Sequence, residues 1–192
     1  MRRHGWKDNR GVKLLGLLRH AKSDWDDMSL RDFDRGLNKR GRKGAALMGK
    51  HIREHGVKWE HLMASPAARV KLTLEAAGLD DGSEGAVDWQ DAIYLASPAT
   101  LIELLRRVEG DPDTVLLAGH NPGLQELIFE LVPPEAENRL FDEAAAKLPT
   151  ASFAVLELEI DDWSKIAPGC GRLVHLARPR DLDPELGPEA RG

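Results

Sequence analysis

The sequence predicts a single α/β domain, built as a three-layer sandwich with a mostly parallel central sheet and helices on both faces. Short apolar segments alternate with segments of helical period along most of the chain, which is typical of parallel sheets. Residues 12–18 are apolar almost throughout, as expected of a central strand that is covered on both faces. With 192 residues, the chain has about the length of one domain. We expect that domain at residues 12–177, after an N-terminal extension at residues 1–11 and before a loosely ordered tail at residues 178–192.

Composition and charge are those of an ordinary globular protein. The chain has 27 Lys and Arg against 32 Asp and Glu, a formal net charge of −5, whereas nucleic-acid binders normally carry a basic excess. We therefore expect no nucleic-acid partner. No run of 18 apolar residues predicts a membrane span, and residues 1–11 lack the apolar core of a signal peptide, so a cytoplasmic location is expected. Cys170, the single cysteine, excludes an internal disulfide and a multi-cysteine metal site.

The first helix is expected from Asn38 to about Gly56. Asn is a favourable N-cap residue and Gly a favourable C-terminal stop. Ala45, Met48 and Ile52 would lie on one face of this helix, which predicts that it packs against the sheet.

A pattern of strand, Ser or Asn, Pro and helix then occurs three times. The copies are residues 61–64 before Ser65-Pro66, residues 92–95 before Ser97-Pro98, and residues 114–118 before Asn121-Pro122. Ser and Asn cap helices and Pro suits the first helical position, so each copy predicts a strand-to-helix turn. Near the C-terminus, alternating residues 156–160 predict a half-exposed strand, and residues 172–177 predict an edge strand.

Four residues with phosphate chemistry follow the predicted strands. Arg19 and His20 follow the first strand, Arg69 follows the second, and His120 follows the strand at residues 114–118. The carboxyl ends of parallel strands share one edge of the sheet, where ligands bind. Guanidinium groups match phosphate oxygens bidentately, and imidazole acts as nucleophile, acid or base near neutral pH. The set predicts phosphoryl transfer without a metal.

Three motifs carry a family resemblance. Residues 18–25 (LRHAKSDW), 65–69 (SPAAR) and 119–123 (GHNPG) resemble the Arg-His, second arginine and second histidine motifs of the histidine phosphatase superfamily. Their order and spacing match over about residues 12–160, and the wording around residues 21–25 and 32–41 is most similar to the small SixA-like phosphohistidine phosphatases. The resemblance implies a phosphoglycerate-mutase-like fold and no cofactor or metal.

The resemblance also implies a role for each residue. His20 would attack phosphorus and become phosphorylated, while Arg19, Arg69 and a protonated His120 would neutralise the charge on the transferring oxygens. Ser23 and Asn121 match polar positions beside the phosphate, although each also suits a turn or a helix cap.

The leaving-group acid is not assigned by the sequence. The segment around residues 91–97 lacks the glutamate that serves this purpose in mutases and many phosphatases of the superfamily. Asp24, Asp26, Asp27 and Asp91 are the candidates, and Asp26 stands where the mutases have Asn. An ionised Asp26 would repel phosphate and could instead pair with an arginine or lysine.

The sequence is compatible with more than one function. The expected function is hydrolysis of phosphohistidine in a protein partner; the alternatives are hydrolysis of a small phosphoester or sugar phosphate, and a phosphate-binding module without turnover. Residues 44–50 match part of a P-loop, but no strand precedes them. His51 and His55 fit an inverted zinc-peptidase pattern, although histidines are also favourable at a helix C-terminus.

Overall fold

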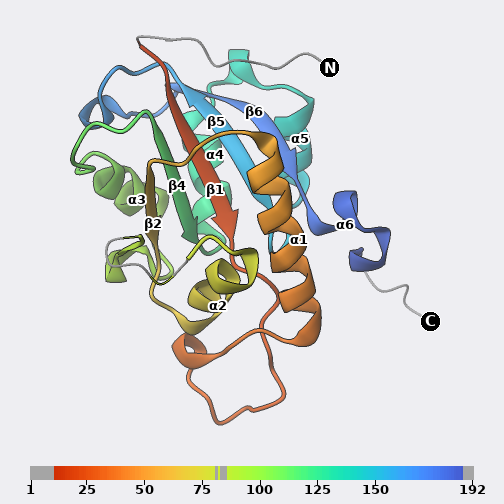
Figure 1. Cartoon of the computed structure of the whole chain (residues 1–192). Coiled ribbons are helices and arrows are strands. Elements are labelled where there is room, and N and C mark those ends of the chain that lie inside the picture. Colours follow the sequence, from red (N-terminus) through yellow and green to blue (C-terminus); the bar gives the residue numbers. More distant parts are fainter. Residues whose placement is uncertain (1–10, 81, 83–85, 188–192) are drawn as a thin grey trace.

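A six-stranded mixed sheet forms the centre of the molecule, which we describe from a computed structural model at residues 11–80, 82 and 86–187 (Figure 1). The strand order is β3-β2-β4-β1-β5-β6. β5 runs antiparallel to both of its neighbours, and the other strands run parallel to one another. The strands are β1 (Lys13–Arg19), β2 (His61–Ala64), β3 (Asp88–Trp89), β4 (Thr114–Gly119), β5 (Phe153–Leu158) and β6 (Gly171–Ala177). The mostly parallel sheet of the sequence prediction is confirmed.

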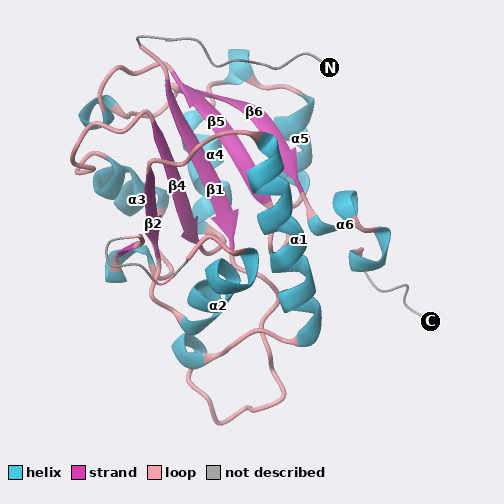
Figure 2. Cartoon of the chain, viewed as in Figure 1, coloured by secondary structure: helices cyan, strands magenta, loops and turns pink. Residues whose placement is uncertain are grey.

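Helices cover both faces of the sheet, as the helix and strand colours of Figure 2 make plain. The helices are α1 (Lys39–His55), α2 (Ala68–Ala77), α3 (Pro98–Leu105), α4 (Gly123–Leu131), α5 (Arg139–Ala146) and α6 (Pro179–Leu182). α1 and α2 pack into one apolar cluster with one face of the sheet, whereas α3, α4 and α5 pack into a second cluster with the other face. The protein is thus the three-layer sandwich that the sequence predicts.

β1 is buried on both faces because its side chains alternate between these two clusters. Leu14 and Leu18 belong to the cluster under α1 and α2, and Leu15 and Leu17 belong to the cluster under α3 to α5. This explains the apolar run at residues 12–18 and confirms its interpretation as a central strand.

α1 begins and ends where the sequence predicts. The Asn38 side chain accepts a hydrogen bond from the backbone of Gly41 at 2.8 Å, and Gly56 ends the helix with φ +86°. Gly49 lets α2 approach closely, since a Cβ atom there would lie 2.0 Å from the Ala77 carbonyl oxygen. The glycine is thus required by packing and does not weaken the assignment of the helix.

The predicted strand at residues 92–95 is wrong. Residues Asp91–Ile93 form a 3-10 turn, and the short strand β3 precedes them at Asp88–Trp89. Ile93 alone anchors the turn in the core, while Leu95 is 56% exposed. The apolar residues at 92–95 suggested a strand, although only Ile93 among them is buried.

Two of the three predicted helix caps are also wrong. Ser97 caps α3 by accepting from the Thr100 backbone, as expected. α2 and α4, in contrast, begin later than predicted, at Ala68 and Gly123, with no side-chain cap. The turns direct Ser65 and Asn121 to other partners, which belong to the candidate site.

The C-terminal part differs from the sequence prediction in three places. β5 begins earlier than predicted and is buried over its first four residues, while the predicted alternation at residues 156–160 is confirmed: Leu156, Leu158 and Ile160 are buried, Glu157 is half-buried and Glu159 is exposed. α5 was not predicted. The segment from Arg178 to Gly187, for which the sequence predicted no secondary structure, forms α6 and a 3-10 turn at Pro184–Leu186. β6 is an edge strand, as predicted. Residues 1–10 and 188–192, which hold most of the predicted extension and part of the predicted tail, lie outside the described residues.

In the described part of the chain, no helix combines the length and the apolarity needed to cross a membrane.

Candidate active site

The carboxyl ends of two neighbouring parallel strands, β1 and β4, bring the predicted histidines together. Arg19 is the last residue of β1, His20 follows it, and His120 follows β4. The His20 backbone donates to the Gly119 carbonyl at 3.0 Å, which continues the pairing of β1 with β4 beyond the strand end. The centroids of the His20 and His120 rings consequently lie 5.3 Å apart.

His20 is held in a defined tautomer. Its Nδ1 atom lies 2.7 Å from the Ala21 carbonyl oxygen. Since a carbonyl oxygen only accepts, Nδ1 carries the proton and Nε2 retains its lone pair. Burial, together with the positive charges of Arg69 and Arg19, lowers the pKa of His20 to about 4. The ring is therefore neutral at pH 7, with a nucleophilic nitrogen.

His120 packs against the turn after β2. Its Nε2 atom lies 2.8 Å from Ser65 Oγ, and its buried Nδ1 atom has no hydrogen-bond partner among the described residues. Burial, His20 and Arg69 lower the pKa of His120 to about 3. In the ligand-free protein the ring is therefore neutral at pH 7, and a protonated His120 beside a bound phosphoryl group stays a prediction. When Ser65 donates to Nε2, Nδ1 carries a hydrogen that can be donated to an anion.

The two arginines differ in how they are held. Arg69 donates to the Asp32 carbonyl oxygen at 2.6 Å and to Asp32 Oδ2 at 2.9 Å. Arg19 donates to the Leu148 carbonyl oxygen at 2.8 Å, while its buried Nε atom lacks a partner among the described residues. Burial and the nearby Arg69 charge lower the pKa of Arg19, so an anion beside both guanidinium groups would relieve their repulsion.

Asp32 and Tyr94 belong to the site and were missed by the sequence analysis. The Tyr94 hydroxyl donates to Asp32 Oδ2 at 2.5 Å, and the Tyr94 ring meets His120 edge-on with centroids 5.3 Å apart. The hydrogen bonds from Tyr94 and Arg69 keep the pKa of Asp32 below its usual range, so this carboxylate is ionised at pH 7. The ionised Asp32 carboxylate therefore orients both Arg69 and Tyr94.

Asn121 lies with the four catalytic candidates, whereas Ser23 forms a separate contact. Asn121 Nδ2 donates at 3.1 Å to the Leu148 carbonyl oxygen, which also accepts from Arg19. Ser23 is buried and pairs through a β-bridge with Leu37. Asn121 is thus placed beside Arg19. The bridge involves the Ser23 backbone and leaves the contact of its hydroxyl with phosphate a prediction.

None of the carboxylates named as possible leaving-group acids forms a hydrogen bond or ion pair with a catalytic candidate among the described residues. Asp24 accepts from the Asp26 backbone and Asp27 accepts from Ser29, so both bond within their own loop. Asp26 and Asp91 are exposed. Among the described residues, Asp32 is the carboxylate that contacts a catalytic candidate.

The zinc-peptidase alternative finds no support in the geometry. His51 and His55 pack with His175 of β6, and their positions do not form a metal-binding group. No set of three or more His, Cys, Asp or Glu side chains within residues 11–80, 82 and 86–187 is arranged to hold a metal ion.

Comparisons with known proteins agree with the geometry. The family model of the histidine phosphatase superfamily (branch 1) matches residues 15–89. An uncharacterised protein of Mycobacterium tuberculosis is 33% identical over 164 residues, which cover 85% of this chain and 100% of the relative. A solved candidate phosphohistidine phosphatase SixA from Nakamurella multipartitia is 28% identical with a TM-score of 0.76, over 90% of this chain and 99% of that chain. Its Agrobacterium tumefaciens counterpart is 27% identical with a TM-score of 0.70, over 87% and 98%.

Proposed function

The chain belongs to the histidine phosphatase superfamily, and from that premise we propose that it is a metal-independent phosphatase that hydrolyses phosphohistidine in a protein partner through a phosphorylated His20. One observation carries the proposal: the bond from His20 Nδ1 to the Ala21 carbonyl leaves Nε2 unprotonated beside two arginines.

The proposed reaction has two steps. In the first, His20 Nε2 attacks phosphorus, the bond from phosphorus to the substrate nitrogen breaks, and the departing imidazole keeps a proton taken up before cleavage. Arg19, Arg69 and the His120 N–H stabilise the charge on the equatorial oxygens. In the second step, water attacks phosphorus, the bond to His20 Nε2 breaks, and phosphate leaves.

The substrate class follows from the carboxylates of the site. An alkoxide needs a proton in order to leave, and a general acid typically contributes about 10² to 10⁴ in rate. Asp32, the carboxylate in contact with Arg69, is ionised and cannot donate that proton at pH 7. An imidazole leaving group is protonated on its own second nitrogen and depends less on such an acid. The names of the similar solved proteins from Nakamurella and Agrobacterium point to the same substrate class.

A side-by-side assay tests this preference. We expect kcat/KM for a phosphohistidine protein, and for an aryl phosphate with an acidic phenol, to exceed that for phosphoserine or a sugar phosphate by roughly 10² or more. Equal or higher kcat/KM on an alkyl ester would contradict the proposal and favour the small-phosphoester alternative. Loss of alkyl-ester turnover in Asp32→Asn, with aryl turnover retained, would then identify Asp32 as the acid.

Two further outcomes separate the remaining alternatives. Absence of turnover on every substrate, together with phosphate binding, would favour the binding module. Addition of a chelator should leave the rate unchanged, because two arginines and two histidines flank the proposed phosphate position and the Asp32 carboxylate is already paired with Arg69. Loss of activity with chelator and its recovery with zinc would contradict metal independence.

A further inference from the structure

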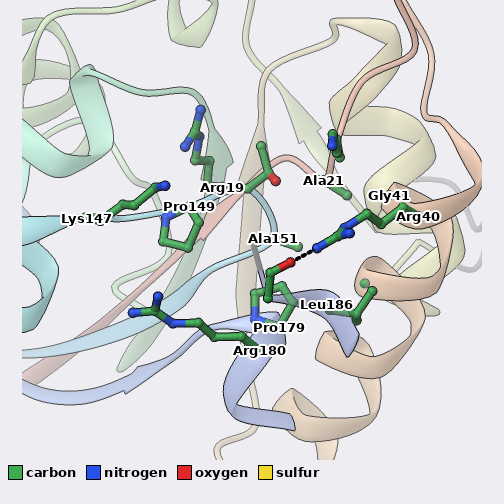
Figure 3. Close-up of a pocket in the computed structure, with 14 residues that line it drawn as sticks. Arg19, Ala21, Arg40, Gly41, Lys147, Pro149, Ala151, Pro179, Arg180 and Leu186 are labelled. Atoms are coloured by element: carbon green, nitrogen blue, oxygen red, sulfur yellow. Dashed lines mark hydrogen bonds between the residues drawn. The ribbon is translucent and has the colours of Figure 1, made fainter. Parts of the chain in front are cut away.

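A basic pocket lies beside the candidate active site. It has a volume of about 330 Å³ and is formed by the first turn of α1, residues 147–151, and the segment of α6 and the following turn. Arg19 lines this pocket, but His20, Arg69 and His120 do not. Figure 3 shows Arg19, Lys147 and Arg180 on one side, and Arg40 on the other side, where it donates to the Gly187 carbonyl. The pocket thus adjoins the catalytic residues through one shared guanidinium group.

Its charge is opposite to that of the whole chain. Among the described residues, the lining contains five basic side chains and no Asp or Glu, although the chain carries a net charge of −5. The basic residues are Arg19, Lys22, Arg40, Lys147 and Arg180. Positive charges around one concave surface repel each other, and they raise the local concentration of anions there.

The carboxylates near this pocket form their ion pairs with Lys43 and Arg178. Asp183 and Glu185 pair with Lys43, which lies outside the pocket. Asp181 is held by Arg178 at 2.9 Å, also outside the pocket. Within the described part of the chain, Lys22 and Lys147 form no ion pair, and Arg180 interacts with Asp181 without direct ion-pair contact. These three side chains are exposed and can turn toward a ligand.

We propose that this pocket is a second anion site, which binds a carboxylate or phosphoryl group of the substrate next to the phosphoryl group that is transferred. The placement beside the transferred group rests on the proposed function. The volume lies at the lower end of the range for small-molecule sites and exceeds the need of one phosphate group. Arg19 would contact both anions. The second anion is either an acidic residue next to phosphohistidine or a second phosphoryl group on a small substrate.

Kinetics with matched substrates distinguish these two sources. The pocket variant is Lys22→Ala/Lys147→Ala, and the charge-matched control is Lys50→Ala/Lys58→Ala, whose residues are exposed and do not line the pocket. One substrate pair is a phosphohistidine peptide flanked by two aspartates and the same peptide flanked by two asparagines. The other pair is a small bisphosphate and p-nitrophenyl phosphate, which has one phosphoryl group.

In one of the two pairs, we expect the pocket variant to raise KM for the substrate with the extra anionic groups about tenfold or more, compared with its change for the other substrate of that pair. The change in kcat should be smaller. The pair that responds identifies the source of the second anion. The control variant should leave both KM ratios within twofold. Equal changes of KM for both members of both pairs would overturn the proposal.

Direct binding separates this proposal from the catalytic one. Pyrophosphate is titrated by calorimetry into the unmutated protein, the pocket variant and the control variant. A loss of affinity of about tenfold in the pocket variant alone supports the second anion site, even for a protein without turnover. Equal pyrophosphate affinity in the pocket and control variants would overturn the second site even with normal turnover. Absent turnover would contradict the proposed function and not the pocket.

Discussion

The histidines of the candidate active site differ from a second group of histidines, which lies between α1 and β6. His51 Nε2 lies 2.9 Å from His175 Nε2, and the His55 and His175 ring centroids are 4.3 Å apart. Phe153 packs against all three rings. Burial and the neighbouring histidines lower the pKa of His175 to about 4, close to that of His20. Both groups are therefore neutral at pH 7.

The neighbours, and not the pKa, distinguish the two groups. His20 and His120 lie beside Arg19 and Arg69, whereas a buried nitrogen without a partner among the described residues occurs in both groups, at His120 Nδ1 and at His55 Nδ1. The group between α1 and β6 has an aromatic ring as its common neighbour. A lowered pKa identifies a buried histidine, whereas converging cations identify an anion site.

Replacing one histidine from each group gives the largest expected contrast. His20→Ala removes the proposed nucleophile and should reduce kcat/KM for aryl phosphate by roughly 10⁴ or more. His175→Gln keeps a hydrogen-bonding side chain far from the reaction and should change kcat/KM less than threefold. Steady-state assays at a temperature where circular dichroism shows both variants folded make the comparison. Similar losses in the two variants would contradict the distinction drawn here.

Arg69→Lys tests the geometry of the cations and should have an intermediate effect. A lysine retains the charge but not the two-pronged donor, so we expect a loss in kcat/KM of roughly 10². The matched control is Arg139→Lys at an exposed ion pair with Glu143, where the rate should not change. Full activity of Arg69→Lys would show that charge alone suffices.

The pH dependence of stability should report on the histidines between α1 and β6. The folded-state pKa of His175 is lowered to about 4 from an ordinary value of 6.5, and the pKa values of His51 and His55 are also lowered by burial. As pH falls below about 6.5, the unfolded chain binds protons that the folded protein does not, so stability decreases down to about pH 4.

Thermal unfolding of the unmutated protein and of His175→Gln measures this effect. Between pH 7 and pH 5 we expect the fall in Tm to be smaller by roughly 2–4 °C in the variant. Parallel Tm profiles would show that this histidine group does not contribute to the acid sensitivity. The effect is the smallest of the three, because these side chains are only partly buried.

The catalytic candidates could be predicted from sequence because each follows a segment whose apolar pattern is local. Arg19 ends β1, and His20 and His120 come directly after β1 and β4, so parallel pairing brings these residues to one edge. The two ends of α1 were predictable for the same reason, since Asn38 and Gly56 act within one turn.

Asp32 and Tyr94 could not be predicted because long-range contacts place them. Asp32 lies in a 3-10 turn of a long loop, which Arg35 holds by donating to the carbonyl oxygens of Asp27 and Leu30. Tyr94 follows the turn that was mistaken for a strand. The basic pocket likewise combines Lys22, Lys147 and Arg180, whose proximity depends on the packing of α6 near α1.

Trapping of the phosphorylated protein tests the central claim, that His20 is the nucleophile, most directly. The protein is mixed with ³²P-labelled phosphohistidine protein, quenched, and divided between acid and alkali before separation. The account predicts a label on this chain that is stable in alkali and labile in acid, that maps to the peptide containing His20, and that is absent from His20→Ala. A label that persists in His20→Ala, or turnover by that variant at the unmutated rate, would contradict it.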